Sequence, residues 1–154
     1  MSDPAIRTYL GQLSFFSGLA PAQLDQLASF ASATRFNAQQ RVFKSESDAD
    51  KFYIVRDGKV GVEIPAIGAE PLRIQTLGNG GVLGWSWLIP PYRWLFDARA
   101  LVPSDIIVID GARLRDHCEA DNVLGYQLMK RFAALMAERL NASRITAIKQ
   151  YSGD

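Results

Sequence analysis

The residues with the most distinctive chemistry lie together in the stretch GVLGWSWLIPPYRWLFDARAL, from Gly81 to Leu101. It contains all three tryptophans of the chain, one tyrosine, one phenylalanine and two adjacent prolines. Such large side chains need a core, a ligand or a partner to cover them. Aromatic walls with a few polar groups suit the binding of a flat or apolar small molecule. Exposed aromatic residues are also strong anchors for a partner protein.

The other reactive side chains form no catalytic or metal-binding set. The only histidine and the only cysteine are adjacent, at His117 and Cys118. Adjacent helical residues point in different directions, and two ligands cannot complete a tetrahedral zinc site. An iron–sulfur cluster requires several cysteines. No Ser/His/Asp arrangement or phosphate-binding loop is visible. The sequence therefore predicts a protein that is not an enzyme and that has no metal and no cofactor.

Length and composition predict one globular domain over residues 1–154, because 48% hydrophobic and 21% charged residues are typical of a folded chain. The formal net charge of +1 gives no electrostatic reason to bind nucleic acid or an anionic membrane. No apolar run reaches membrane-spanning length, and the N-terminus lacks a secretion signal. We therefore expect a cytoplasmic protein with no nucleic-acid partner and no membrane association.

Hydrophobic spacing divides the chain into three parts. Residues 1–33 have helical periodicity. Residues 34–110 contain short β-rich runs between turn residues, and the pair Asp57-Gly58 predicts a β-hairpin. Residues 111–151 return to helix, with a short helix followed by a long one over 122–151. The sequence thus predicts an α+β fold, in which an antiparallel jelly-roll β-barrel is flanked by N-terminal helices and by two C-terminal helices.

The order of these parts resembles the cyclic nucleotide-binding domain of the catabolite-activator and Fnr superfamily. The resemblance covers residues 15–151 and is carried by four segments: FFSGLAPAQLDQLASFA, FKSESDADKFYIVRDGKVGV, TLGNGGVLGW and ARALVPSDIIVIDGARLRDHC. In that superfamily the long last helix usually forms a dimer and leads into a DNA-binding helix-turn-helix. Because the sequence stops soon after this helix, we expect a stand-alone sensor domain without a helix-turn-helix.

The resemblance places the phosphate-binding cassette at residues 81–97. The family has a ribose-binding Glu where this chain has Trp85, and a phosphate-binding Arg where it has Trp94. The family's Ser or Thr is replaced by Asp97, whose carboxylate would repel a phosphate. A buried phosphate needs a cation and N–H donors, so the resemblance implies a degenerate cassette. The candidate ligand-binding residues are Leu83, Gly84, Trp85, Ser86, Arg93, Trp94 and Asp97, with Arg139 and Ser143 from the long helix.

Two turn glycines of the family are also replaced, by Gln40 and Ser47. A turn position with positive φ favours glycine, because only glycine adopts it without a steric cost. We therefore expect these two turns to differ from the family pattern.

Three functions are compatible with these features. The first is a regulatory or sensor domain that binds a non-nucleotide ligand or a partner protein through the loop Trp85–Trp94, whose aromatic residues either plug the vacated nucleotide pocket or line an open one. The second is a receptor for cAMP or cGMP in which Arg93 replaces the missing arginine. The third is a non-catalytic accessory subunit of an enzyme complex.

The long helix predicts a homodimer, because its apolar stripe is longer than the barrel needs for its own cover. Burial of that stripe would supply about 25 cal/mol for each Å². The residues expected in the interface are Leu128, Phe132, Leu135, Met136 and Leu140.

Overall fold

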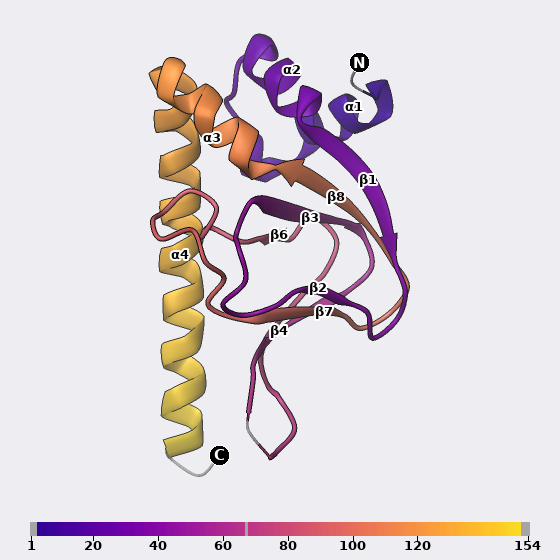
Figure 1. The fold of residues 1–154 in the computed structure, drawn as a ribbon, viewed down its shortest axis with the longest axis vertical. Helices are drawn as coiled ribbons and strands as arrows, with labels where there is room; N and C mark the ends of the chain where they lie inside the picture. Colours follow the sequence, from indigo (N-terminus) through magenta and orange to yellow (C-terminus); the bar gives the residue numbers. More distant parts are fainter. Residues whose placement is uncertain (1–2, 67, 152–154) are drawn as a thin grey trace.

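The computed structural model describes residues 3–66 and 68–151, with the backbone alone described at 143, 146, 147 and 149–151. Helices gather at one end of a β-structure, and a long helix runs along its side (Figure 1). The helices are α1 (Pro4–Gln12), the 3-10 helix η1 (Ser14–Phe16), α2 (Pro21–Ser29), α3 (Gly111–Ala120) and α4 (Asn122–Tyr151). The strands are β1 (Ala31–Phe36), β2 (Arg41–Phe43), β3 (Lys51–Asp57), β4 (Val60–Ile64), β5 (Leu72–Leu77), β6 (Val82–Leu83), β7 (Asp97–Ala100) and β8 (Ser104–Asp110).

The strands form two four-stranded sheets, in the orders β1-β8-β3-β6 and β2-β7-β4-β5. All the pairings are antiparallel. The predicted α+β jelly-roll architecture, with helices before and after the strands, is confirmed. The predicted hairpin at Asp57-Gly58 is wrong, because β3 and β4 belong to different sheets. A Cβ on Gly58 would overlap the side chain of Ser104, and the Gly58 N–H donates to Asn79 Oδ1 at 2.8 Å. This glycine therefore makes a corner between the sheets.

The helical segment predicted over residues 1–33 is too long, because α2 ends at Ser29 and β1 begins at Ala31. The backbone of β1 pairs with β8 along its whole length, from Ala31↔Ile109 to Phe36↔Ser104. The barrel therefore begins at residue 31 rather than 34.

The predicted C-terminal helices are confirmed, and a carboxylate caps each of them. Asp110 accepts from the Arg113 N–H at 3.1 Å at the start of α3, and Asp121 accepts from the Leu124 N–H at 3.1 Å at the start of α4. Such caps satisfy N–H groups that have no partner within the helix. Although α4 has 30 residues, no helix in the described part of the chain is long and apolar enough to cross a membrane.

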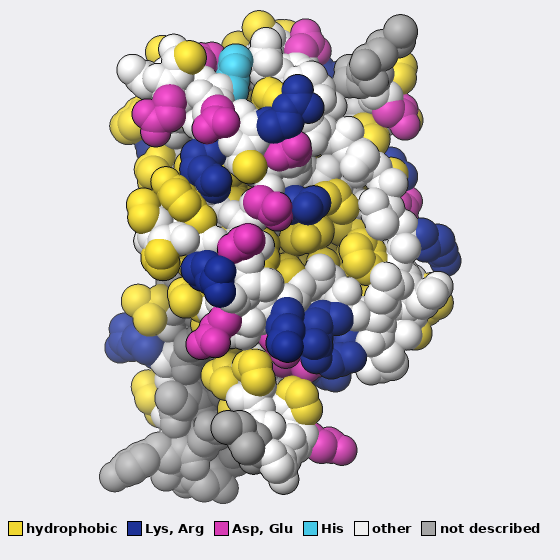
Figure 2. All heavy atoms as spheres, in the orientation of Figure 1, with side chains coloured by type: hydrophobic (Ala, Val, Ile, Leu, Met, Phe, Trp, Pro, Cys, Tyr) yellow, Lys and Arg dark blue, Asp and Glu magenta, His cyan; other side chains and the backbone are white. Residues whose placement is uncertain are grey.

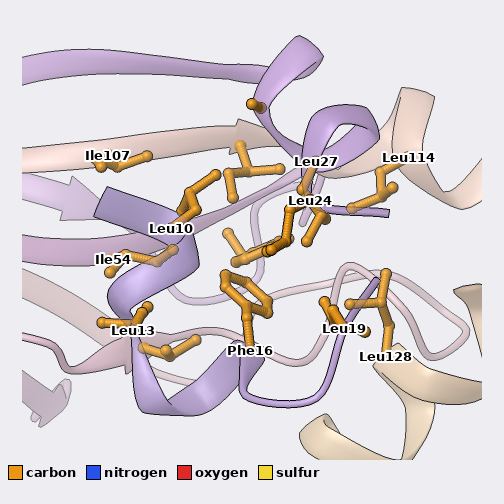
Figure 3. Packing of buried hydrophobic residues seen from close by; sticks show 14 of the residues in the cluster. Leu10, Leu13, Phe16, Leu19, Leu24, Leu27, Ile54, Ile107, Leu114 and Leu128 are labelled. Atoms are coloured by element: carbon orange, nitrogen blue, oxygen red, sulfur yellow. The ribbon is translucent and has the colours of Figure 1, made fainter. Parts of the chain in front are cut away.

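Two hydrophobic clusters lie on opposite faces of the β1-β8-β3-β6 sheet. The helix-side core packs α1, α2, α3 and α4 against this sheet, and Figure 3 shows it around Leu10, Phe16 and Leu27. The barrel core lies between the two sheets and contains Val55, Val60 and Ile106. Strand β3 serves both clusters, because its alternate residues point to opposite faces. Phe52 and Ile54 enter the helix-side core, whereas Tyr53 and Val55 enter the barrel core.

Candidate functional site

The aromatic loop joins β6 to β7 and consists of turns. The Leu88 N–H donates to the Trp85 carbonyl at 3.0 Å, and the Tyr92 N–H donates to the Ile89 carbonyl at 3.0 Å. The end of the loop pairs with the turn that follows β2. Here the Trp94 N–H donates to the Ser47 carbonyl at 3.0 Å, and the Trp94 carbonyl accepts from the Glu46 N–H at 2.8 Å. Main-chain hydrogen bonds therefore hold Trp94 in position.

The indole of Trp94 lies inside the barrel and is 4% exposed. It stacks on Phe43 of β2, with ring centroids 3.9 Å apart and an angle of 11° between the rings. Its outer edge lies against the backbone of Gly84, where an added Cβ would be 2.5 Å from two ring atoms. Gly84 has φ of +95°. Only glycine fits both this backbone conformation and this contact.

Little space remains beside Trp94. The hollow between Phe43, Trp85, Trp94 and Arg139 has a volume of about 20 Å³, which is enough for about one water molecule. The sequence left two possibilities for the aromatic loop, a plug or an open pocket. In the structure, the indole of Trp94 fills the space and acts as a plug.

Trp85 has a different environment from Trp94, although the two belong to the same loop. It is half-buried and packs edge-on against Phe96, with ring centroids 6.5 Å apart. The guanidinium carbon of Arg139 lies 5.7 Å from the centroid of the Trp85 ring. Trp85 thus forms a boundary between the filled interior and α4.

A larger groove lies on the outer side of Trp85 and has a volume of about 160 Å³. We call it the side groove. The walls come from β4, β5, the aromatic loop and α4, and they are mostly apolar. The lining residues are Val62, Ile74, Gln75, Trp85, Phe96, Met136, Arg139 and Leu140.

Arg139 is a buried cation, with 9% of its surface exposed. It donates one hydrogen bond to the Val82 carbonyl. No carboxylate of the described residues forms an ion pair with it. Burial lowers the pKa of its guanidinium to about 10, although the charge of Glu138 acts in the opposite direction. The side chain therefore stays protonated at neutral pH, and it lines both the small hollow and the side groove.

Arg93 lies outside the pocket, contrary to its inclusion among the candidate ligand residues. Its side chain is half-exposed and forms an ion pair with Asp48 at 2.9 Å. It also donates to the Glu46 carbonyl. Because Trp94 points into the barrel, its neighbour Arg93 points outward, as alternate residues of an extended segment do.

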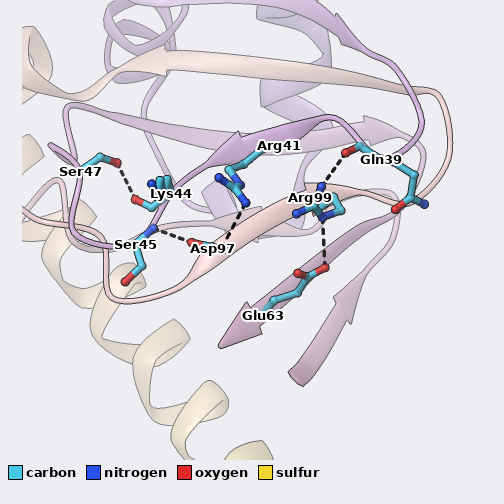
Figure 4. Close-up of polar contacts among 8 residues, drawn as sticks. All are labelled: Gln39, Arg41, Lys44, Ser45, Ser47, Glu63, Asp97 and Arg99. Atoms are coloured by element: carbon cyan, nitrogen blue, oxygen red, sulfur yellow. Dashed lines mark hydrogen bonds and ion pairs between the residues drawn. The ribbon is translucent and has the colours of Figure 1, made fainter. Parts of the chain in front are cut away.

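Asp97, also a candidate ligand residue, lies outside the lining of the small hollow and holds the turn after β2. It is 4% exposed and accepts a hydrogen bond from the Ser45 N–H at 2.7 Å. Its other oxygen lies 3.9 Å from the Arg41 guanidinium. Figure 4 shows both contacts, and Figure 2 shows basic side chains gathered over this sheet. The carboxylate therefore fixes the turn after β2 and does not face the hollow.

The remaining candidates fall into two groups. Leu83, Gly84 and Ser86 line the small hollow beside Trp94, as the resemblance implies. The side chain of Ser143 lies outside the described residues. Sequence reasoning missed pocket residues that come from distant strands, and no local signal marks them. They are Phe43, Val62, Ile74 and Gln75.

Trp87 is a core residue. It is fully buried in the helix-side core, stacked on Phe52 with ring centroids 5.0 Å apart and edge-on to Phe132 at 5.4 Å. Its indole N–H is buried and has no hydrogen-bond partner among the residues that the structure describes. Tyr92, also in the loop, lies under the guanidinium of Arg115, 3.9 Å from the ring centroid.

The predicted dimer interface needs correction, because three of its five residues are buried within the protein itself. Leu128 and Phe132 are inaccessible and Leu135 is 9% exposed, since all three pack in the helix-side core. Met136 lines the side groove. Leu140 is 65% exposed. The apolar stripe read from the sequence is therefore mainly the face of α4 that covers the barrel.

Within the described residues, no group of His, Cys, Asp and Glu side chains is arranged to hold a metal ion. His117 Nε2 lies 3.7 Å from Asp121 Oδ2 on the same face of the helix end. Burial raises the pKa of the Cys118 thiol to about 11, with help from the charges of Asp121 and Glu119. The thiol therefore stays protonated at neutral pH, when it is a poor nucleophile.

Residues 33–121 match the family described as cyclic nucleotide-binding domain. The chain belongs to this family. The resemblance read from the sequence is thereby confirmed at the level of the family, whose domains are regulatory and typically non-catalytic. No curated protein matches the chain.

Solved structures agree with this assignment. A putative cyclic nucleotide-binding protein from Geobacter metallireducens GS-15 is 30% identical, with 87% of this chain and 97% of that chain covered and a TM-score of 0.79. A cyclic nucleotide-binding domain from Methylobacillus flagellatus KT is 16% identical, with 94% and 82% covered and a TM-score of 0.78. The regulatory subunit of a cAMP-independent protein kinase A from Trypanosoma cruzi, bound to guanosine, is 18% identical, with 97% and 50% covered and a TM-score of 0.71. The last two comparisons show a shared fold.

Proposed function

We propose that this protein is a regulatory domain whose cassette is degenerate and accepts no cyclic nucleotide, and whose effector is a non-nucleotide ligand. The observation that carries the proposal is the position of Trp94. Its indole stacks on Phe43 and touches the backbone of Gly84. The resemblance puts the phosphate-binding arginine at this position, so an apolar ring occupies the place of the required cation.

Electrostatics supports the proposal. A cyclic phosphate must lose its hydration when it enters the barrel, and this loss is costly unless a fixed cation and N–H donors replace the water. An indole offers one N–H and no positive charge. Arg93 is held outside by Asp48. The loss of one charge-assisted pair weakens binding by a few kcal/mol, and about 1.4 kcal/mol corresponds to a factor of ten in affinity.

The Trypanosoma cruzi kinase subunit supports the proposal that the effector is not cAMP, because that protein is described as cAMP-independent and bound to guanosine. A domain with this fold therefore does not need cAMP as its ligand. For the present chain, the space beside Trp85 and Arg139 is the place where a different effector fits.

Isothermal titration with cAMP and cGMP tests the proposal. We expect no binding of either nucleotide at concentrations up to about 1 mM, the range of very weak affinities. The double variant Trp85→Glu, Trp94→Arg restores the two family residues, and we expect it to bind at least one nucleotide measurably. A micromolar dissociation constant for the unmodified protein, abolished by Arg93→Ala, would contradict the proposal and favour a receptor that uses Arg93.

The exposed face of α4 favours a second element of the function, a homodimer through this helix. Hydrophobic side chains lie along the edge that α4 forms (Figure 2). These side chains are exposed, whereas Leu128, Phe132 and Leu135 are buried. They belong to Val123, Tyr126, Met129, Leu140, Ile145 and Ile148, of which only Leu140 was expected in the interface. We expect light scattering to give the mass of a dimer, and Tyr126→Glu with Met129→Glu to give a monomer. A monomer mass for the unmodified protein would refute this element and leave the cassette proposal intact.

A further inference from the structure

Arg139 is placed where three hollows meet. It lines the small hollow beside Trp94, the side groove, and a third hollow of about 310 Å³ between η1, β5 and α4. Its guanidinium carries five N–H donors, and among the described residues they have a single acceptor, the Val82 carbonyl. A buried charge normally has a partner of opposite sign, because an unpaired charge is costly to bury. None of the described carboxylates takes that position.

We propose that Arg139 anchors a ligand in the side groove, and that this ligand is a small monoanion with a flat apolar body, of the aryl carboxylate class. The proposal rests on the proposed function and deepens it, because it names the chemistry of the non-nucleotide effector and the residue that binds it.

The carboxylate end of this ligand follows from the geometry of arginine. The N–H groups of a guanidinium form a planar fork that matches the two oxygens of a carboxylate. Arg139 is fixed by its bond to Val82 and by its position over the Trp85 ring. The fork is therefore already oriented before a ligand arrives, which lowers the entropic cost of binding.

The apolar body follows from the walls of the side groove. Trp85 and Phe96 offer aromatic surface, and Ile74 and Leu140 offer aliphatic surface from β5 and α4. Gln75 is the uncharged polar residue in the same wall. A pocket with apolar walls and few polar groups is typical of small-molecule sites. The volume of about 160 Å³ favours a ligand with one ring over a nucleotide.

The single charge follows from the surroundings of Arg139. Glu138 is next to it in α4, lines the adjoining hollow, and acts on Arg139 through its charge. A dianion such as a phosphate monoester would bring a second negative charge towards Glu138, which costs energy at short range. One negative charge balances Arg139 without this repulsion.

The experiment compares cinnamate with cinnamamide, which have the same flat body and differ in the charged group. Isothermal titration on the full chain should show that cinnamate binds at least about tenfold more tightly, since a hydrogen bond to a charged group contributes more than a neutral one. In Arg139→Gln the two compounds should bind equally weakly. The matched control is Arg144→Gln, which removes the same charge from an exposed position of the same helix, and it should keep the tenfold difference.

Arg139→Gln could also weaken the fold, because Arg139 is buried. The variant Leu140→Asp avoids this difficulty, since Leu140 is largely exposed and the new carboxylate at the rim of the groove competes for Arg139. We expect it to lose cinnamate binding while its thermal unfolding stays close to that of the unmodified protein.

Three results would overturn the proposal. They are no binding of cinnamate, equal binding of cinnamate and cinnamamide, and a tenfold difference between them that survives in both Arg139→Gln and Leu140→Asp. A parallel titration with cAMP distinguishes failure of the proposed function from failure of the anion site. Tight cAMP binding refutes the proposed function, whereas absence of both cAMP and cinnamate binding leaves the closed cassette standing and refutes only the anion site.

Discussion

Trp87 and Trp94 come from the same loop and are both buried, but they belong to different cores. Trp87 is fully enclosed between Phe52 and Phe132, in the cluster that joins the sheet to the helices. Trp94 enters the barrel from its open side and meets Phe43, which is itself partly exposed. Trp87 therefore belongs to the scaffold, whereas Trp94 fills a space next to a groove that is open to solvent.

The difference teaches that burial by itself does not define the role of an aromatic residue. The cost of removing a buried side chain depends on how well its site collapses or refills. The site of Trp87 is closed on all sides by hydrophobic residues. The site of Trp94 adjoins the small hollow and Trp85, and the hollow has room for about one water molecule.

The largest expected effect is that of Trp87→Ala. The substitution leaves a large cavity in the helix-side core, and we expect it to lower the free energy of unfolding by about 4–5 kcal/mol, the upper part of the range for such changes. Urea denaturation followed by circular dichroism measures this quantity. A loss below about 2 kcal/mol would mean that Trp87 is not part of the scaffold.

Trp94→Ala should have a smaller effect of about 3 kcal/mol, because its site lies at the edge of the barrel core, beside the partly exposed Phe43. We also expect a gain of function, since a dry apolar cavity binds an apolar molecule of matching shape. Free indole should therefore raise the melting temperature of this variant and leave that of the unmodified protein unchanged. If Trp94→Ala costs as much as Trp87→Ala and indole has no effect, the distinction between scaffold and plug fails.

The smallest expected effect concerns the turn that holds Trp94. Glu46 donates its N–H to the Trp94 carbonyl and has φ of +67°, a conformation in which a side chain is strained. We expect Glu46→Gly to stabilise the protein by about 0.5–1 kcal/mol. The matched control is Glu46→Ala, which removes the same charge but keeps the Cβ, and should show no gain. Equal effects of the two substitutions would assign the change to charge.

Sequence periodicity predicted most of the fold because the helices and strands obey simple patterns. The short β-rich run KFYIVR is a local signal, and the structure has strand β3 there, with Phe52 to Val55 all buried. The prediction of a hairpin at Asp57-Gly58 was wrong because the same turn residues occur in a hairpin and in a corner between two sheets. At the two turns where Gln40 and Ser47 replace family glycines, the left-handed conformations fall one residue earlier, on Gln39 and Glu46.

The site was harder to predict than the fold. A loop has no regular hydrophobic periodicity. Its sequence therefore does not predict that Trp87 and Trp94 enter different cores. The partner of Trp94 is Phe43, and the walls beside Arg139 include Ile74 and Gln75. These contacts join distant segments and follow only from the way the two sheets close on each other.

The junction before α4 has a mechanical consequence. One residue, Asp121, separates α3 from α4, and the backbone there is tied by hydrogen bonds from Asp121 to His117 and from Gly125 to Asp121. A helix of 30 residues is about 45 Å long at 1.5 Å per residue. If it pivots at this junction, a tilt of about 10° moves its far end by about 8 Å over that length. Small changes in packing near the barrel would thus reach the end of α4 as displacements larger than the width of a side chain.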